Sequence, residues 1–246
     1  MRNEIILGDC LEKMKDIPCG CVDMILCDLP YGTTQSDWDI IIPFEPLWIE
    51  YERVIKDNGA IVLFGAEPFS SYLRLSNIKL YKYDWIWDKI KGTGFLNAKK
   101  QPLRVHETIS VFYKNQCNYN PQKTTGHNNK KSFRGKHLQT EVYGELTRNY
   151  LYESTERYPT SIQVFSTDTQ NSSLHPNQKP VSLLRYLIRT YTNEGDLILD
   201  NSAGSGSTGI ACIEENRNFI LIEKHKHYYE ITLSRISEHT AQLKLL

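Results

Sequence analysis

Apolar runs of four to six residues alternate along the chain with longer segments in which apolar residues recur every three to four positions. The short runs are typical of strands that are buried on both faces of a parallel sheet. The longer segments predict amphipathic helices. We expect strands at 5–7, 22–27, 60–64, 196–200 and 219–223, and helices at 43–56, 68–75, 180–191, 210–215 and 228–243. Because strands and helices alternate, the pattern predicts an open α/β fold with a mainly parallel sheet.

Two further runs, 83–87 and 108–113, lie close together in sequence and predict an antiparallel pair at an edge of the sheet. Between 115 and 173 the periodicity disappears, and Asn, Gln, Lys, Thr, Gly and Tyr dominate, which indicates an inserted segment. The predicted division is therefore 1–114, an insertion at 115–172, and 173–246.

Composition restricts the class of protein without identifying it. The 246 residues are 40% hydrophobic and 24% charged, which is ordinary for a globular protein. No apolar run approaches the length of about 18 residues that crosses a membrane, and residues 1–4 do not begin a secretory signal, so we expect a cytoplasmic protein. Cys19-Gly20-Cys21 has no matching second pair, so we expect no metal site.

Charge is unevenly distributed although the net charge is zero. Between 89 and 136 there are eleven cations, and Glu107 is the only acid. This excess predicts a surface for a polyanion, and a solvated basic loop is the alternative. The cations that we take as candidates for this contact are Lys99, Lys100, Arg104, Lys123, Lys130, Lys131, Arg134 and Lys136.

A glycine-containing loop, Asp200–Gly206, joins a predicted strand to the beginning of a helix. Glycines allow the backbone to turn sharply and to approach a ligand, and ligands bind at the carboxyl ends of such strands. The next strand ends at Glu223, whose carboxylate can accept hydrogen bonds from ribose hydroxyls. The loop therefore predicts a nucleoside-containing cofactor. The spacing of Gly204, Gly206 and Gly209 also matches the G-x-G-x-x-G fingerprint of dinucleotide-binding proteins, so NAD remains an alternative cofactor. A purely structural turn is the other alternative.

The segment Asp28-Leu29-Pro30-Tyr31 follows another buried strand and should reach the same edge of the sheet. The Asp28 carboxylate and the Leu29 carbonyl can accept the two hydrogens of a base amino group, which localises the lone pair on its nitrogen. Pro30 keeps the turn rigid and donates no hydrogen bond. Tyr31 offers an aromatic face, and stacking of a base on such a face is worth about 1–3 kcal/mol. The alternative is a strand end that Asp28 caps.

These segments resemble the motifs of one family. Asp28–Tyr31 is similar to the D/N/S-P-P-Y/F motif of the amino-directed DNA methyltransferases, and Asp200–Gly206 to their cofactor motif, D-P-F-x-G-S-G. His175–Pro180 is similar to their H-P-x-Q-K-P segment. The order of the motifs resembles the beta class, most closely its phage and prophage members. Leu29 departs from the usual proline, and Asn201-Ser202 replaces Pro-Phe.

The resemblance implies a Rossmann-like fold that depends on S-adenosyl-L-methionine and carries an inserted target-recognition segment at 115–172. It implies transfer of a methyl group to adenine N6 of double-stranded DNA by direct attack of a flipped-out base. Asp at position 28 favours adenine, because cytosine N4 enzymes more often carry Ser there. The alternatives are a cytosine N4 enzyme, an NAD-dependent oxidoreductase and an inactive DNA-binding relative. Homodimerisation and a cognate restriction endonuclease stay open.

The site residues follow from the motifs and the resemblance together. The catalytic candidates are Asp28, Leu29, Pro30 and Tyr31. The cofactor-binding candidates are Asp9, Cys10, Lys179, Asp200, Asn201, Ser202, Ala203, Gly204, Gly206, Glu223 and Lys224. Asp9 either lines the cofactor's adenine or caps a helix at 11–14, and Lys179 either lies near the methionine end or only precedes a helix. Candidates for reading base edges are Asn118, Asn120, Gln122, Arg134 and Lys136.

Overall fold

The computed structural model describes residues 3–34, 36, 39–134, 138–140, 144–146, 150–167 and 178–243. The chain divides into two compact units, one formed by 1–120 with 161–246 and the other by 121–160. Within the described ranges, no helix is both long and apolar enough to cross a membrane.

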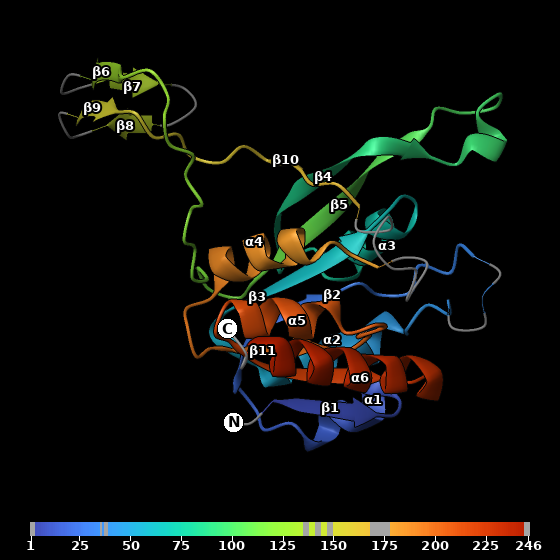
Figure 1. Cartoon of the computed structure of the whole chain (residues 1–246). Helices are drawn as coiled ribbons and strands as arrows, with labels where there is room; N and C mark the ends of the chain where they lie inside the picture. The colour runs from blue at the N-terminus through green and yellow to red at the C-terminus, as the bar shows by residue number, and fades with distance from the viewer. Residues whose placement is uncertain are drawn as a thin grey trace. The chain divides into compact units, whose positions relative to one another are not determined.

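The larger unit is built on an eight-stranded sheet with the order β1-β12-β11-β2-β3-β5-β4-β10 (Figure 1). The strands are β1 (Glu4–Leu7), β2 (Val22–Cys27), β3 (Ile55–Gly65), β4 (Tyr81–Thr93), β5 (Arg104–Phe112), β10 (Ile162–Val164), β11 (Leu197–Asp200) and β12 (Asn218–Glu223). Every neighbouring pair is parallel except the two that involve β5, which runs antiparallel to both β3 and β4. The predicted mainly parallel sheet is therefore confirmed.

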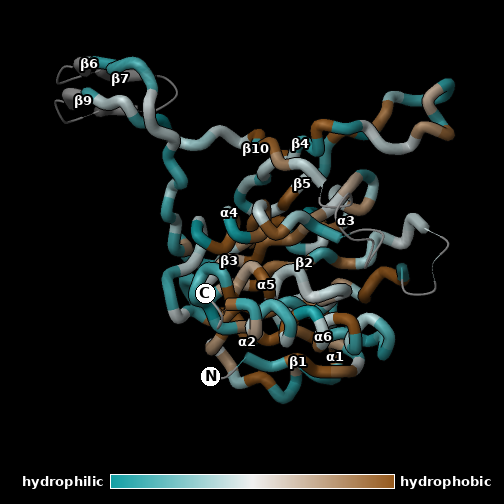
Figure 2. Tube along the Cα trace, viewed as in Figure 1, coloured by the Kyte–Doolittle hydropathy of each residue, from teal (hydrophilic) through white to brown (hydrophobic). Residues whose placement is uncertain are grey.

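Helices cover both faces of this sheet because its strands are apolar on both sides. In β3, Ala60, Val62 and Phe64 belong to one core, and Ile61 and Leu63 belong to the other. The first core packs against α4 (Val181–Tyr191), α5 (Ser207–Glu214) and α6 (Lys226–Leu243); the second packs against α1 (Cys10–Lys13), α2 (Phe44–Val54) and α3 (Phe69–Ser76). Figure 2 shows the apolar strands beneath helices that expose polar residues.

The predicted helices and strands are confirmed to within a few residues at most ends, but the antiparallel strand is not at the edge. β4 and then β10 extend the sheet beyond β5, so β5 is the third strand from that end. β10 lies in the stretch that has no hydrophobic pattern, and its Ile162 and Val164 are exposed. Backbone pairing with β4, rather than side-chain burial, holds this strand, so its sequence carries no signal.

The smaller unit consists of two antiparallel pairs, β6 (Lys130–Arg134) with β9 (Tyr150–Ser154), and β7 (Leu138–Thr140) with β8 (Gly144–Leu146). It is shorter than the insertion predicted at 115–172. Residues 115–120 belong to the larger unit, where the backbone N–H of Asn120 donates to the Thr190 carbonyl over 2.7 Å.

Candidate active site

The carboxyl ends of four parallel strands meet at one edge of the sheet and surround a cavity of about 590 Å³. Asp28 directly follows β2, whereas Asp200 and Glu223 are the last residues of β11 and β12. Asp9 follows β1. All four line this cavity, together with Gly204. The structure thus brings the Asp28–Tyr31 segment and the glycine loop to one cleft, as the sequence predicts.

The Asp28–Tyr31 segment forms one wall of the cavity. The Tyr31 hydroxyl donates to Asp28 Oδ1 over 2.7 Å, and the Tyr31 ring stacks on Phe69 with centroids 4.9 Å apart. Burial and the adjoining Asp28 carboxylate raise the pKa of Tyr31 well above its ordinary value, so its hydroxyl keeps its proton. Leu29 is buried. The ring of Tyr31 is therefore held in place by a hydrogen bond at its edge and by an aromatic neighbour on its face.

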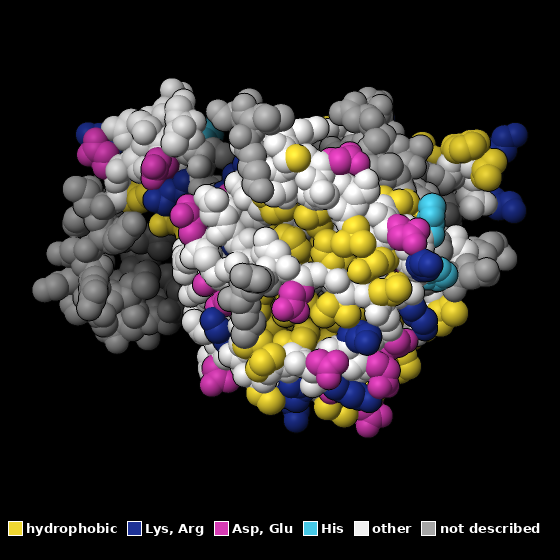
Figure 3. Space-filling model, turned by 60° about the horizontal axis from the view of Figure 1, so that its bottom comes forward, with side chains coloured by type: hydrophobic (Ala, Val, Ile, Leu, Met, Phe, Trp, Pro, Cys, Tyr) yellow, Lys and Arg dark blue, Asp and Glu magenta, His cyan; other side chains and the backbone are white. Residues whose placement is uncertain are grey.

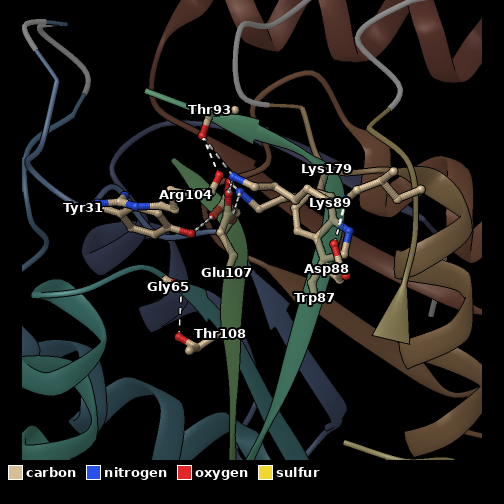
Figure 4. Close-up of polar contacts among 12 residues, drawn as sticks. Tyr31, Gly65, Trp87, Asp88, Lys89, Thr93, Arg104, Glu107, Thr108 and Lys179 are labelled. Atoms are coloured by element: carbon tan, nitrogen blue, oxygen red, sulfur yellow. Dashed lines mark hydrogen bonds and ion pairs between the residues drawn. The ribbon is translucent and has the colours of Figure 1, made fainter. Parts of the chain in front are cut away.

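Four charged side chains of alternating sign adjoin this wall, and Figure 4 shows three of them, Lys179, Glu107 and Lys89. Lys179 Nζ lies 2.6 Å from Asp28 Oδ2 and 3.2 Å from Glu107 Oε2. Lys89 Nζ lies 3.2 Å from Glu107 Oε1. The side chains of Lys89, Glu107 and Lys179 are at most 15% exposed, and that of Asp28 is 28% exposed. We call Asp28, Lys179, Glu107 and Lys89 the charged chain.

The pKa values of the charged chain follow from burial and pairing. Burial raises the pKa of Asp28, Lys179 opposes that rise, and Glu107 adds to it. Burial also disfavours the Glu107 carboxylate, but Lys179 and Lys89 outweigh it and lower the pKa of Glu107. Burial disfavours the Lys179 ammonium, yet the two carboxylates raise the pKa of Lys179. Removal of Lys179 would therefore leave two carboxylates facing each other without their shared cation.

Hydrogen bonds from the backbone shape the glycine loop, which forms the adjoining part of the cavity wall. Glu223 Oε2 accepts from the Gly204 N–H over 2.8 Å, and Oε1 accepts from the His225 N–H over 2.7 Å. Gly206 adopts a φ of +77°, and a Cβ there would lie 2.7 Å from Thr232 Cγ2. Glycine at 206 therefore meets two demands at once, a left-handed turn and close packing against α6.

Asp200 and Asn201 are buried at the start of this loop. Asp200 accepts from the Thr208 hydroxyl over 2.6 Å and from the Ser202 N–H over 3.1 Å, and burial raises its pKa to about 6. Asn201 Oδ1 accepts from the Tyr51 hydroxyl over 2.5 Å. Asn201 Nδ2 is buried and makes no hydrogen bond to another described residue, although Asn201 lines the cavity. An unsatisfied buried donor at a cavity wall fits a ligand that carries an acceptor.

The sequence leaves two interpretations open for Asp9 and for Lys179, and the contacts of both side chains bear on them. Asp9 Oδ1 accepts from the Leu11 N–H over 3.0 Å, which is the helix-capping contact, and Asp9 Oδ2 pairs with Lys224. Lys179 precedes α4 but does more than begin it, because its ammonium contacts Asp28. The other cofactor candidates, including Cys10, Ser202 and Ala203, also line the cavity, except Gly206, which is packed against Thr232 of α6.

Three charged residues at the site were not predicted as site residues. Glu107 belongs to the charged chain, and its only sequence signal is that it is the one acid within the basic stretch. Lys89 is one of the eleven cations between 89 and 136 that predict a basic surface, but it does not lie on the surface, because it is 6% exposed and paired with Glu107. Asp39 accepts from the N–H groups of Gly32, Thr33 and Thr34 and so shapes the loop after Tyr31.

The cations that we predict to contact a polyanion differ in their ion pairing. Lys99, Lys100 and Arg104 are exposed, and Arg104 lines the cavity. In the smaller unit Lys123, Lys130 and Lys131 are all exposed, and Lys123 pairs with Glu156 and Lys131 with Glu153. Glu156 and Glu153 thus neutralise part of the predicted excess. The Arg134 side chain and Lys136 lie outside the described residues.

Of the base-reading candidates, Asn120 is unsuited to that role. Its side-chain amide donates to the carbonyls of Arg189 and Thr192, so it is used to anchor the segment that leaves the sheet. Asn118 and Gln122 are half-buried, and their roles stay predictions. Among the described residues, no group of three or more His, Cys, Asp or Glu side chains is arranged to hold a metal ion.

Comparison with known proteins places these motifs in a family. A family model for N6/N4 methyltransferases, described as DNA methylase, matches residues 22–234. The chain belongs to the DNA methylase family. This methylase is 28% identical to the type II methyltransferase M.HinfI of Haemophilus influenzae over 96% of its own length and 68% of the relative's. It is also 28% identical to the DNA adenine methyltransferase YhdJ of Escherichia coli (strain K12), over 94% and 82%.

Solved structures support the fold of the methylase. The M1.HpyAVI–SAM complex aligns with a TM-score of 0.64 at 23% identity and covers 94% of this chain and 98% of that one. The cytosine-N4-specific PvuII DNA methyltransferase aligns with a TM-score of 0.65 at 16% identity and covers 98% and 93%. The predicted Rossmann-like methyltransferase fold is confirmed. The resemblance to phage and prophage members in particular stays a prediction.

Proposed function

We propose that this DNA methylase transfers a methyl group from S-adenosyl-L-methionine to N6 of adenine in double-stranded DNA. One observation carries the proposal: the Asp28 carboxylate and the Asp200–Gly206 loop open into the same cavity. The activated methyl group comes with S-adenosyl-L-methionine, so the protein's task is to position and polarise the base.

The Asp28 wall supplies what an amino group of a base requires. In the proposed reaction, the Asp28 carboxylate and the Leu29 carbonyl accept the two amino hydrogens, which localises the lone pair for attack. The Tyr31 ring stacks on the base, while its hydroxyl holds the carboxylate from the other side. Lys179 favours the ionised form of Asp28, which can only accept hydrogen bonds. The surplus proton leaves to Asp28 or to water after the attack.

The part of the cavity wall formed by the glycine loop fits a nucleoside-containing cofactor. Asn201 Nδ2 is a buried donor in need of an acceptor, and Glu223 retains lone pairs beside its two backbone contacts. Asp200, Ser202, Ala203, Gly204, Asp9, Cys10 and Lys224 would complete this wall. The relative M1.HpyAVI was solved with SAM, which supports the same cofactor here. An NAD-dependent oxidoreductase would leave the charged chain without a role.

Adenine is the target that two independent features favour. The first motif residue is Asp28, where cytosine N4 enzymes of the resembling class more often carry Ser. The relative YhdJ is a DNA adenine methyltransferase. The PvuII enzyme has the same fold and is cytosine-N4-specific, so the fold alone does not favour either base. Cytosine N4 is therefore the second candidate.

The test is methyl transfer by the wild-type protein and by Asp28→Ala to bacterial DNA that lacks methylation, followed by single-molecule sequencing. We expect N6-methyladenine at one short sequence with the wild type and none with Asp28→Ala, while both bind S-adenosyl-L-methionine and DNA. N4-methylcytosine would select the second candidate. Absence of transfer by both proteins would indicate an inactive DNA-binding relative, and calorimetric binding of NAD instead of S-adenosyl-L-methionine would refute the proposal.

A further inference from the structure

The β4–β5 hairpin extends well beyond the sheet that forms its base (Figure 1). Every residue from Ile90 to His106 is exposed, so this part of the hairpin packs against no described core. At its end, a short 3-10 helix, η2 (Phe95–Asn97), follows Gly94, whose φ of +87° reverses the chain. A projection of this kind gains no stability from burial, which points to a contact with something outside the chain.

The end of the hairpin is apolar and locally ordered. Leu96 is 85% exposed and Phe95 is 77% exposed, the two highest values among the large hydrophobic side chains of the described residues. Four backbone hydrogen bonds hold the turn. They run from the Asn97 N–H to the Gly94 carbonyl, from the Ala98 N–H to the Phe95 carbonyl, and from the N–H groups of Lys100 and Gln101 to the Asn97 carbonyl. Figure 3 shows hydrophobic side chains between cations at its right-hand end, where Figure 1 draws the hairpin.

The charge around the apolar end is of one sign. Between 89 and 106 the sequence contains no Asp or Glu. Lys91, Lys99, Lys100 and Arg104 are exposed, and none of them forms an ion pair with a described residue. An apolar end flanked by unpaired cations is complementary to the apolar base stack and the phosphates of DNA. A second copy of the chain would present the same cations, and the two like-charged surfaces would repel each other.

The base of the hairpin belongs to the wall that would receive the target base. Thr93 and Arg104 pair across the hairpin, and both line the cavity together with Glu107 (Figure 4). Arg104 is three positions from Glu107 along the extended strand, which corresponds to about 10 Å. The end of the hairpin therefore projects outward from the wall beside which a flipped base would leave the duplex.

We propose that the β4–β5 hairpin enters the duplex next to the extruded nucleotide and that Phe95 and Leu96 fill the space that this nucleotide leaves. Apolar side chains in other DNA-bending proteins insert between base steps in this way. Lys99 and Lys100 contact the flanking phosphates. This inference rests on the proposed function, since it concerns how the protein extrudes a paired target base from the duplex.

The test compares wild type, Phe95→Ala/Leu96→Ala and Lys99→Ala/Lys100→Ala on two duplexes that contain the recognised sequence. In one the target base is paired, and in the other an abasic site faces it, so that extrusion needs little help. We expect the apolar variant to lose about tenfold or more in kcat on the paired duplex and to return within about threefold of wild type on the other. We expect the lysine variant to weaken binding to both duplexes equally and to flatten the salt dependence, by about 0.9 in slope for each lost contact.

Equal activity of the apolar variant and wild type on both duplexes, or an equal loss on both, would overturn the inference. A change in sedimentation of the apolar variant would also overturn it, because the hairpin end would then be a contact between copies. If the wild type transfers no methyl group at all, the proposed function fails by itself. The hairpin is then judged by DNA affinity, which the apolar variant must lower for the paired duplex and not for the duplex with an abasic site.

Discussion

Removal of the Lys179 ammonium should shift the acid limb of methyl transfer to higher pH. In Lys179→Met, Asp28 and Glu107 lose the cation that lies 2.6 Å and 3.2 Å from their oxygens. Breaking a buried ion pair costs about 3–5 kcal/mol, because it leaves a charge without its partner. One pKa unit corresponds to about 1.4 kcal/mol, so a cost of about 3 kcal/mol raises the pKa of Asp28 by about two units if protonation of Asp28 relieves it. The acid limb of the pH–rate profile then moves to higher pH by the same amount. Transfer at neutral pH then falls, and it recovers as the pH rises.

The assay is the single-turnover rate of methyl transfer as a function of pH with saturating cofactor and DNA. Lys15→Met is the matched control, since Lys15 pairs with Glu12 at the surface and both side chains are more than half exposed. We expect its profile to coincide with that of wild type. Thermal unfolding of each variant establishes that it remains folded at the temperature of the assay.

Glu107→Gln supplies a second perturbation, for which the reasoning predicts the opposite sign. The Glu107 carboxylate raises the pKa of Asp28 and competes with it for Lys179. Its replacement by a neutral amide should lower the pKa of Asp28, so the acid limb moves to lower pH. Limbs that stay at the wild-type position in both variants, or that move in the same direction, would refute the view that the charged chain controls the ionisation of Asp28.

Three further outcomes are expected. Gly206→Ala should lower the free energy of unfolding by about 2 kcal/mol or more in urea denaturation, because the left-handed φ costs about 1–2 kcal/mol and the new Cβ meets Thr232; an unchanged midpoint contradicts this. Asp200→Asn should gain stability relative to wild type as the pH rises from 4 to 7. Burial raises the pKa of Asp200 to about 6, so the wild type loses about 3 kcal/mol of stability by neutral pH as that carboxyl ionises. A difference in free energy of unfolding between variant and wild type that is the same at pH 4 and pH 7 in urea denaturation would exclude this effect. Lys130→Ala/Lys131→Ala should reduce the salt slope of DNA binding by less than Lys99→Ala/Lys100→Ala does, since Lys131 already pairs with Glu153; a larger reduction would reverse that order.

The sheet and the position of the cleft could be predicted because buried strands and their ends carry strong local signals. Apart from Asp23, the run at 22–27 is apolar because both of its faces are covered, and a polar residue follows at Asp28, where the strand ends. The same change occurs at Asp200 and at Glu223. Because neighbouring parallel strands end at the same edge of a sheet, the sequence alone was enough to assign the three acids to one cleft.

The charged chain could not be predicted, because its contacts join residues that are distant in sequence. Lys179 and Asp28 are 151 positions apart, and Glu107 lies on the one strand that runs against the others. Nothing in the local pattern separates the buried Lys89 from the exposed Lys91, which is two positions further along the same strand. Glu107 pairs in register with Trp87, and its side chain reaches Lys89 further along β4. Which lysine is buried therefore depends on the strand register.

The register also explains how the chemistry and the inserted unit can be independent. β11 pairs directly with β2, Ile198 with Met24 and Leu199 with Ile25, so the two halves of the chain meet in the middle of the sheet. The charged chain draws Asp28, Lys89 and Glu107 from before the smaller unit and Lys179 from after it. Because 121–160 contributes none of these groups, we expect substitutions within that unit to leave the contacts among Asp28, Lys179 and Glu107 unchanged.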